Sequence, residues 1–199
     1  MFQENKCLLC GYDNPDILED HLVAFSGEYG YSEPSISLHL CVNCHRAIHR
    51  CSWTLVSEGS EAVIAKYLSH LETILPPSFF HVLHAELLSA NENVIRQYQR
   101  LNNYVLATRS LGKKCSLCDC SNPDLLEEHD LNAWSQHPQS TTENMGVCAN
   151  CHRILVKFYE KKTSPTSEQS KALLQKYLSQ VGQLISGQTR SELNNFLKS

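Results

Sequence analysis

The sequence predicts a small α+β protein made of two tandem copies of one module, and three observations lead to this prediction. Two Cys-x-x-Cys pairs lie about 30 residues apart near the start of the chain, and two more with similar separation follow residue 113. The residues around the pairs are repeated as well. Each second pair is followed by apolar residues at helical spacing. The chain is therefore divided into a first module with its helical extension (1–90), a connecting helix (91–112) and a second module with its extension (113–199).

The cysteine pairs predict two structural zinc ions that staple the modules. The first residues lack the apolar stretch of a secretory signal, so we expect a cytoplasmic protein whose cysteines stay reduced. A Cys-x-x-Cys turn directs two thiolates at one ion, and two such turns complete a tetrahedral zinc site. Redox-active pairs are the alternative, but they have no reason to occur as a duplicated pair of pairs. The eight expected zinc ligands are Cys7, Cys10, Cys41, Cys44, Cys115, Cys118, Cys148 and Cys151.

The repeat extends well beyond the cysteines. Residues 14–21 match 122–129, and 41–46 match 148–153. In each copy two Cys-x-x-Cys turns, or zinc knuckles, flank a segment that suits a β-ribbon whose ends meet at the zinc. Such a ribbon is too small to be secure on hydrophobic burial alone, so zinc and packed helices are expected to stabilise it.

Helical segments follow the knuckles in both copies. Residues 63–75 and 173–185 have apolar side chains at helical spacing, and both contain Lys-Tyr-Leu-Ser. A second, shorter helix is predicted from about Ser78 and from about Thr189, which gives each module a helical pair. Residues 91–108 are predicted to form the connecting helix. The simplest interpretation of these apolar stripes is core-facing helix surface.

The composition is that of an ordinary globular protein. Hydrophobic residues make up 42% of the chain, and no apolar run is long enough to cross a bilayer, so we expect no membrane contact. The net charge of −4 is unevenly distributed. Residues 1–90 contain four Lys or Arg against eleven Asp or Glu, whereas residues 91–199 contain thirteen against ten. Only the second part has the sign of a phosphate-binding surface.

Two short motifs of the first copy have polar chemistry beyond the cysteines. Asp20-His21 ends the first repeat block, and His45 and His49 follow the second knuckle. His45 and His49 are four residues apart, so they lie on one face of a helix and can bind one cation together. Consecutive residues of a regular strand face opposite sides, so Asp20 and His21 share a site only at a strand end or distortion. Glu19 is the alternative ligand.

Together with the knuckles, these motifs resemble the zinc-knuckle branch of the HNH nucleases, closely in the first module and less completely in the second. The resemblance implies a ββα-metal module in each copy and metal-dependent hydrolysis of phosphodiester bonds, in DNA or, as the alternative, in RNA. It implies that Asp20, His45 and His49 bind Mg²⁺, Mn²⁺ or another divalent ion. It also implies that His21 is the general base, and that the setting is bacterial or phage defence.

Both copies depart from the HNH pattern. In the first copy, Ile36 stands where the family has the Asn that orients the base. In the second copy, Val156 stands where the final His belongs. The first module is therefore the candidate catalytic one and the second is degenerate. The candidate site residues that the second copy retains are Glu128, His129, Asn144 and His152.

Basic residues of the linker and of the second copy are candidates for nucleic-acid contacts, because they can neutralise phosphates. A solvated helix has the same composition, so ordinary surface charge is the competing interpretation. The candidates are Arg96, Arg100, Lys113, Lys114, Lys161 and Lys162.

Two other functions fit the sequence. The incomplete sites suit a non-catalytic zinc module that binds nucleic acid or a protein. The acidic first copy suits a subunit of a larger complex with a basic protein partner. A divalent-metal-dependent nicking activity would identify the enzyme, and co-purification of a partner would identify the subunit.

Overall fold

The structure is a computed structural model, and its description is confined to part of the chain. The predicted connecting helix (91–112) lies outside that part, as does Ser78, where the second helix of the first copy is expected to begin. The described residues are 6–23, 36–51, 57–75, 77, 80–81, 84–85, 114–131, 144–161, 165–181 and 187–198.

The first copy is a short antiparallel hairpin followed by helices. Its elements are η1 (Pro15–Ile17), β1 (Leu18–Val23), β2 (Ile36–Cys41), α1 (Val42–Cys51) and α2 (Glu58–Ile74). The 3-10 turn η1 forms because the Asn14 side chain accepts a hydrogen bond from the Asp16 amide at 3.0 Å and proline occupies the first helical position. In the hairpin, Leu18 lies opposite Cys41. This register brings the start of β1 beside the second knuckle.

The second copy repeats this arrangement. Its elements are η3 (Pro123–Leu125), β3 (Leu126–Asp130), β4 (Asn144–Cys148), α4 (Ala149–Lys161), α5 (Glu168–Val181) and α6 (Gly187–Lys198). The strands are antiparallel again, with Leu126 opposite Cys148. The helix expected from about Thr189 is α6, which begins two residues earlier. Two small antiparallel sheets with helices confirm the predicted α+β class.

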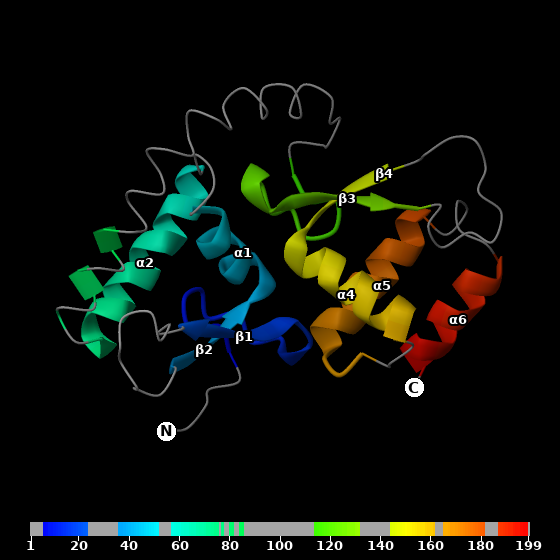
Figure 1. The fold of residues 1–199 in the computed structure, drawn as a ribbon. Coiled ribbons are helices and arrows are strands. Elements are labelled where there is room, and N and C mark those ends of the chain that lie inside the picture. Colours follow the sequence, from blue (N-terminus) through cyan, green and yellow to red (C-terminus); the bar gives the residue numbers. More distant parts are fainter. Residues whose placement is uncertain are drawn as a thin grey trace.

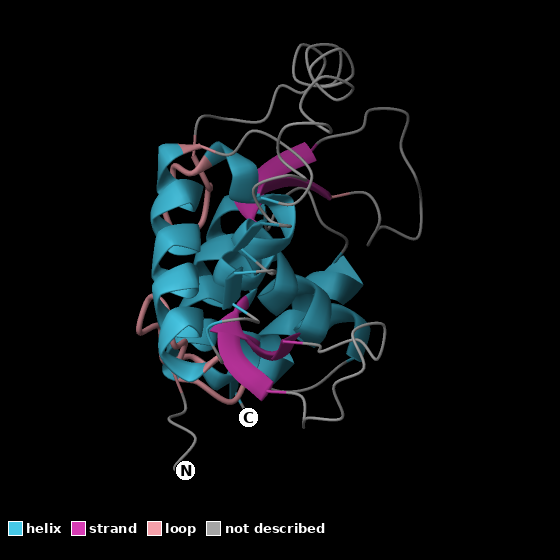
Figure 2. Cartoon of the chain, turned by 60° about the vertical axis from the view of Figure 1, so that its left-hand side comes forward, coloured by secondary structure: helices cyan, strands magenta, loops and turns pink. Residues whose placement is uncertain are grey.

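The two copies share one core. Figure 1 shows them side by side with α1 and α4 between them, and Figure 2 shows helices between the two strand pairs. The apolar stripes predicted for residues 63–75 and 173–185 do face this core, through part of their members. The fully buried side chains are from both copies and include Ile17, Leu40, Leu71, Val147, Ile154, Leu155, Phe158, Leu174, Tyr177 and Val181.

The contact between the copies is reciprocal at the first turns of α1 and α4. The Asn43 amide donates to the Asn150 side-chain oxygen at 2.7 Å, and the Asn150 amide donates to the Asn43 side-chain oxygen at 2.9 Å. These amides are among the orphan donors that every helix N-terminus leaves. The two equivalent residues therefore cap one another's helices, as the halves of an isologous dimer would.

The η turns cap helices of the opposite copy. Asp124 of η3 accepts the backbone amide of Ser57, the N-cap of α2, at 2.6 Å. Asp16 of η1 accepts the amides of Thr166 and Ser167, just before α5, at 3.2 and 3.3 Å. Lys157 of α4 also pairs with Asp16 at 3.2 Å. A carboxylate at a helix N-terminus satisfies orphan donors and complements the helix dipole. Each copy thus stabilises the long helix of the other.

Candidate metal centres

The first tetracysteine cluster joins the two knuckles of copy one. One ligand atom from each of Cys7, Cys10, Cys41 and Cys44 lies within 4.8 Å of all the others. The sulfurs of Cys10 and Cys41 are 3.7 Å apart. Tetrahedral zinc with Zn–S bonds of about 2.3 Å separates its sulfurs by about 3.8 Å. The four thiols therefore fit one zinc ion without rearrangement.

The second cluster has the same form. Cys115, Cys118, Cys148 and Cys151 also lie within 4.8 Å of one another, and the sulfurs of Cys118 and Cys148 are 3.5 Å apart. In this cluster the neighbouring thiols shift one another's pKa values in opposite directions. The pKa of Cys115 is lowered, chiefly by Cys118, and the pKa of Cys151 is raised, chiefly by Cys115. Four neighbouring thiols cannot all lose their protons unless a cation balances the negative charge. A zinc ion held by the four sulfurs would supply that charge.

The first knuckle of each copy is closed by the same backbone turn. In copy one the Gly11 amide donates to the Cys7 carbonyl at 2.8 Å, and Gly11 has φ 72°, a left-handed conformation that glycine adopts without strain. In copy two Asp119 takes this place, with φ 61°. Cys120 lies directly after it; its carbonyl accepts the Cys115 amide at 2.8 Å, and the neighbouring Cys148 thiol, with burial, raises the pKa of Cys120. The spacing of the motifs left Cys120 outside the zinc ligands, and the structure places it against them.

A third cluster lies beside the tetracysteine cluster of copy one and consists of histidines. His21 of β1 and His45 and His49 of α1 each place a ring nitrogen within 4.8 Å of the others. The Nε2 atoms of His45 and His49 are 3.0 Å apart. Two imidazoles bound to one zinc at about 2.0–2.1 Å have nitrogens about 3.4 Å apart. The three rings can therefore hold one cation with a small outward shift.

A carboxylate orients one of these rings. Glu19 accepts a hydrogen bond from Nδ1 of His45 at 2.9 Å, which leaves Nε2 with its lone pair facing His49. The structure does not place Asp20 with the histidines: its carboxylate pairs with His39 at 2.7 Å and is 70% exposed. Alternation along β1 is the reason, because Glu19 and His21 face one side and Asp20 the other. Asp20 forms no part of the cluster, and Glu19 contacts it through Nδ1 of His45.

His21 is the most enclosed of the three rings. Its side chain is buried, and its Nε2 lies 3.0 Å from the Tyr67 hydroxyl of α2. Burial, assisted by the charges of His45 and His49, lowers the pKa of His21 to about 4. Burial followed by the charge of His45 also lowers the pKa of His49. Both rings are neutral at physiological pH, the state in which imidazole binds a metal.

Tyr67 is a site residue that the sequence pattern assigned only to the core. The repeat contained the signal, since Lys-Tyr-Leu-Ser occurs in both copies. In copy two the equivalent Tyr177 places its hydroxyl 3.4 Å from Nε2 of His129. The histidine–tyrosine contact is thus duplicated with the fold.

The second copy has part of the same arrangement. His129 and His152 have ring centroids 5.4 Å apart, and Glu127 hydrogen-bonds with Nδ1 of His152. Val156 follows where His49 stands in copy one, and among the described residues no third histidine joins the pair. The other two candidates lie on the hairpin and are exposed: Glu128 opposite Gly146, and Asn144 at the start of β4.

Among the nucleic-acid candidates, Lys114 has a described side chain, and it is engaged in an ion pair. Lys114 pairs with Asp119 at 2.8 Å. Lys157 and Arg153, which lie near Lys161 in the sequence, pair with acidic residues of copy one. The other nucleic-acid candidates, Arg96, Arg100, Lys113, Lys162 and the side chain of Lys161, lie outside the described residues.

The chain matches no protein-family model, no curated protein and no solved structure. Within the described residues, no helix is both long and apolar enough to cross a membrane.

Proposed function

We propose that the protein is a metal-dependent phosphodiesterase that hydrolyses nucleic acid, DNA in preference to RNA, at the histidine cluster of copy one. The observation that carries this proposal is the convergence of His21, His45 and His49 on one point, with Glu19 behind His45. The resemblance to zinc-knuckle HNH nucleases supplies the substrate class. Each copy would then be a ββα-metal module, and the second a degenerate one.

The donor set bears on the identity of the cation. Imidazole nitrogens suit Zn²⁺, Ni²⁺ and Co²⁺, whereas Mg²⁺ and Mn²⁺ favour carboxylates and water. With Asp20 turned away, the imidazoles of His21, His45 and His49 are the available ligands. We therefore propose Zn²⁺, Ni²⁺ or Co²⁺ at this site, rather than the Mg²⁺ or Mn²⁺ that the resemblance names first.

The residues in and around the cluster are assigned different roles. His21 is assigned as a ligand rather than the general base, because its ring is buried and faces its two partners. Tyr67 holds the His21 ring, and Glu19 fixes the His45 ring. When bound, the cation supplies Lewis acidity that lowers the pKa of water and neutralises phosphate charge. In hydrolysis the water oxygen bonds to phosphorus, the P–O ester bond breaks, and the leaving oxygen takes up a proton.

A non-catalytic role is the second candidate, and one observation favours it. Four of the described cations, Arg46, Arg153, Lys114 and Lys157, are each paired with a carboxylate. A surface that binds phosphates needs cations available to them. In this case the zinc-stapled fold would be an interaction module, alone or as a subunit of a complex.

The test is cleavage of supercoiled plasmid and of a structured RNA by the zinc-loaded full chain, with Ni²⁺, Co²⁺, Zn²⁺, Mn²⁺ or Mg²⁺ added. His49→Val gives copy one the residue that copy two has, and we expect it to lower cleavage at least a hundredfold, because the metal loses a ligand. His152→Ala is the matched control in copy two and should cleave as the unaltered chain does. Absence of cleavage by folded, zinc-loaded protein with every metal would favour the interaction module.

A further inference from the structure

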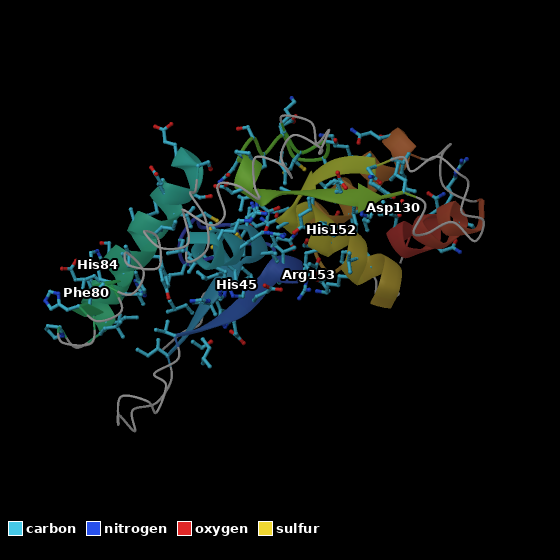
Figure 3. All side chains as sticks on the ribbon, turned by 45° about the horizontal axis from the view of Figure 1, so that its top comes forward. His45, Phe80, His84, Asp130, His152 and Arg153 are labelled. Carbon is cyan, nitrogen blue, oxygen red and sulfur yellow. The ribbon has the colours of Figure 1, made fainter. Side chains whose placement is uncertain are left out.

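Glu19, the carboxylate that contacts His45, is also bound by a residue of the opposite copy. Glu19 uses both of its oxygens: Oε2 accepts from Nδ1 of His45 at 2.9 Å, and Oε1 accepts from the Arg153 guanidinium at 2.6 Å. Arg153 belongs to α4, within the second copy. Figure 3 shows His45 and Arg153 close together where the two copies meet, far from His84.

We propose that Arg153 is a positioning residue for the metal site of copy one, so that the degenerate second copy completes the site of the first. This inference rests on the proposed metal binding by His21, His45 and His49. Arg153 contacts neither the cation nor the substrate; it acts through Glu19, which in turn sets the ring of His45.

The physical argument concerns the freedom of the Glu19 side chain. It is 23% exposed, so it can turn towards water unless both oxygens are held. A guanidinium fixes the plane of a carboxylate as well as neutralising it. With that plane fixed, Oε2 stays in line with Nδ1 of His45, and His45 keeps the tautomer whose Nε2 is open to a cation. Without Arg153, Glu19 can rotate and His45 can change tautomer.

The chain contains its own control for this experiment. Arg46 of α1 pairs with Glu127, and Glu127 contacts Nδ1 of His152, so the same chain of contacts runs in the opposite direction. Arg46→Ala removes an equivalent ion pair across the same interface. It acts, however, on the copy that has Val156 in place of the third histidine. Any general loosening of the interface is common to both variants, and only Arg153→Ala disturbs the complete cluster.

The experiment is a Co²⁺ titration of the full chain with zinc kept in both tetracysteine sites, followed by visible absorption. Histidine nitrogens and cysteine thiolates give Co²⁺ different spectra, so binding at the cluster is distinguished from zinc exchange. Arg153→Ala should weaken Co²⁺ binding about tenfold, the lower end of the effect of removing an outer-shell partner. Arg46→Ala should change it less than twofold, and Arg153→Lys, which keeps the charge, should restore part of the affinity. Zinc content should be equal in all variants.

A second readout is the tautomer of His45 in the Co²⁺-free protein, measured by ¹⁵N NMR of its ring. The unaltered chain should hold the proton on Nδ1, and Arg153→Ala should show a mixture, whereas Arg46→Ala should not. Equal weakening in both alanine variants, or no change in either, overturns the role of Arg153 while leaving the metal site standing. An unaltered chain that binds no Co²⁺ outside the tetracysteine sites overturns the proposed function itself.

Discussion

At the scale of single residues, the buried ring of His129 should make the stability of the protein depend on pH. His129 is 2% exposed, and burial, with a smaller effect of the His152 charge, lowers its pKa to about 4. The ring is therefore neutral in the folded protein down to mildly acidic pH, whereas an unfolded histidine takes up a proton near pH 6.5. The unfolded state binds more protons between these two values, so the stability that this ring contributes is present above pH 6.5 and is lost as the pH falls towards 4.

His129→Gln tests this linkage. Glutamine can still reach the Tyr177 hydroxyl but does not titrate, so the variant should lose less stability on acidification. Between pH 7 and pH 5.5 the unaltered chain should lose about 1 kcal/mol more than the variant. Urea denaturation at the two pH values, with zinc retained in both proteins, measures the difference. Equal losses would mean that His129 takes up its proton over the same pH range in the folded and the unfolded protein.

At the scale of secondary structure, the reciprocal caps make each long helix depend on the other copy. Asp16 is 4% exposed, and burial alone would raise its pKa. Hydrogen bonds from Thr166, Ser170 and Lys157 outweigh burial, and its pKa is lowered instead. Asp124 is only half-buried and accepts the Ser57 amide. The cap on α5 is therefore the more enclosed of the two.

Removal of the two caps should lower the free energy of unfolding by unequal amounts. Asp124→Ala should lower the free energy of unfolding by about 1 kcal/mol, the usual effect of losing an N-cap. Asp16→Ala should cost about 2–3 kcal/mol, because it also leaves buried donors and the Lys157 ammonium without their acceptor. Asp13→Ala, at an exposed contact with Gln169, is the control and should change little. Urea unfolding monitored by far-UV circular dichroism provides the three values; equal costs at Asp13 and Asp16 would contradict the capping role.

The sequence predicts the elements better than the contacts between them. Residues 14–21 and 122–129 are recognisable as a repeat, and the helical stripes follow from their spacing. Which surfaces of the copies meet cannot be read from spacing, because the Asn43–Asn150 contact involves residues that a single module leaves at its surface. The sequence alone could not decide which carboxylate lies beside the histidines. Strand alternation raised the choice between Asp20 and Glu19, and only the register and position of β1 decide it.

At the scale of the whole molecule, the shared core and exchanged caps couple the two tetracysteine clusters. Cys151→Ser should release zinc from copy two, and because a structural zinc contributes on the order of 10 kcal/mol, that copy should unfold. We expect copy one to lose protection as well, since its α2 is capped by η3 and its core continues into α4. Native mass spectrometry of zinc content and hydrogen exchange of residues 18–23 measure both effects.

Cys120→Ser is the matched control for Cys151→Ser. Cys120 touches the cluster but is the fifth thiol there, so its replacement should leave two zinc ions bound and exchange unchanged. Full protection of β1 in Cys151→Ser would mean that the copies fold independently.

The reciprocal contact of Asn43 with Asn150 also bears on how such a molecule can evolve. In a dimer of identical chains, replacing the last histidine by valine would remove it from both halves at once. After duplication and fusion the two positions are inherited separately, so His49 and Val156 can coexist in one chain. On the proposed role of Arg153, selection can keep the half that lacks the third histidine for the contact that its Arg153 makes with Glu19 of the other half.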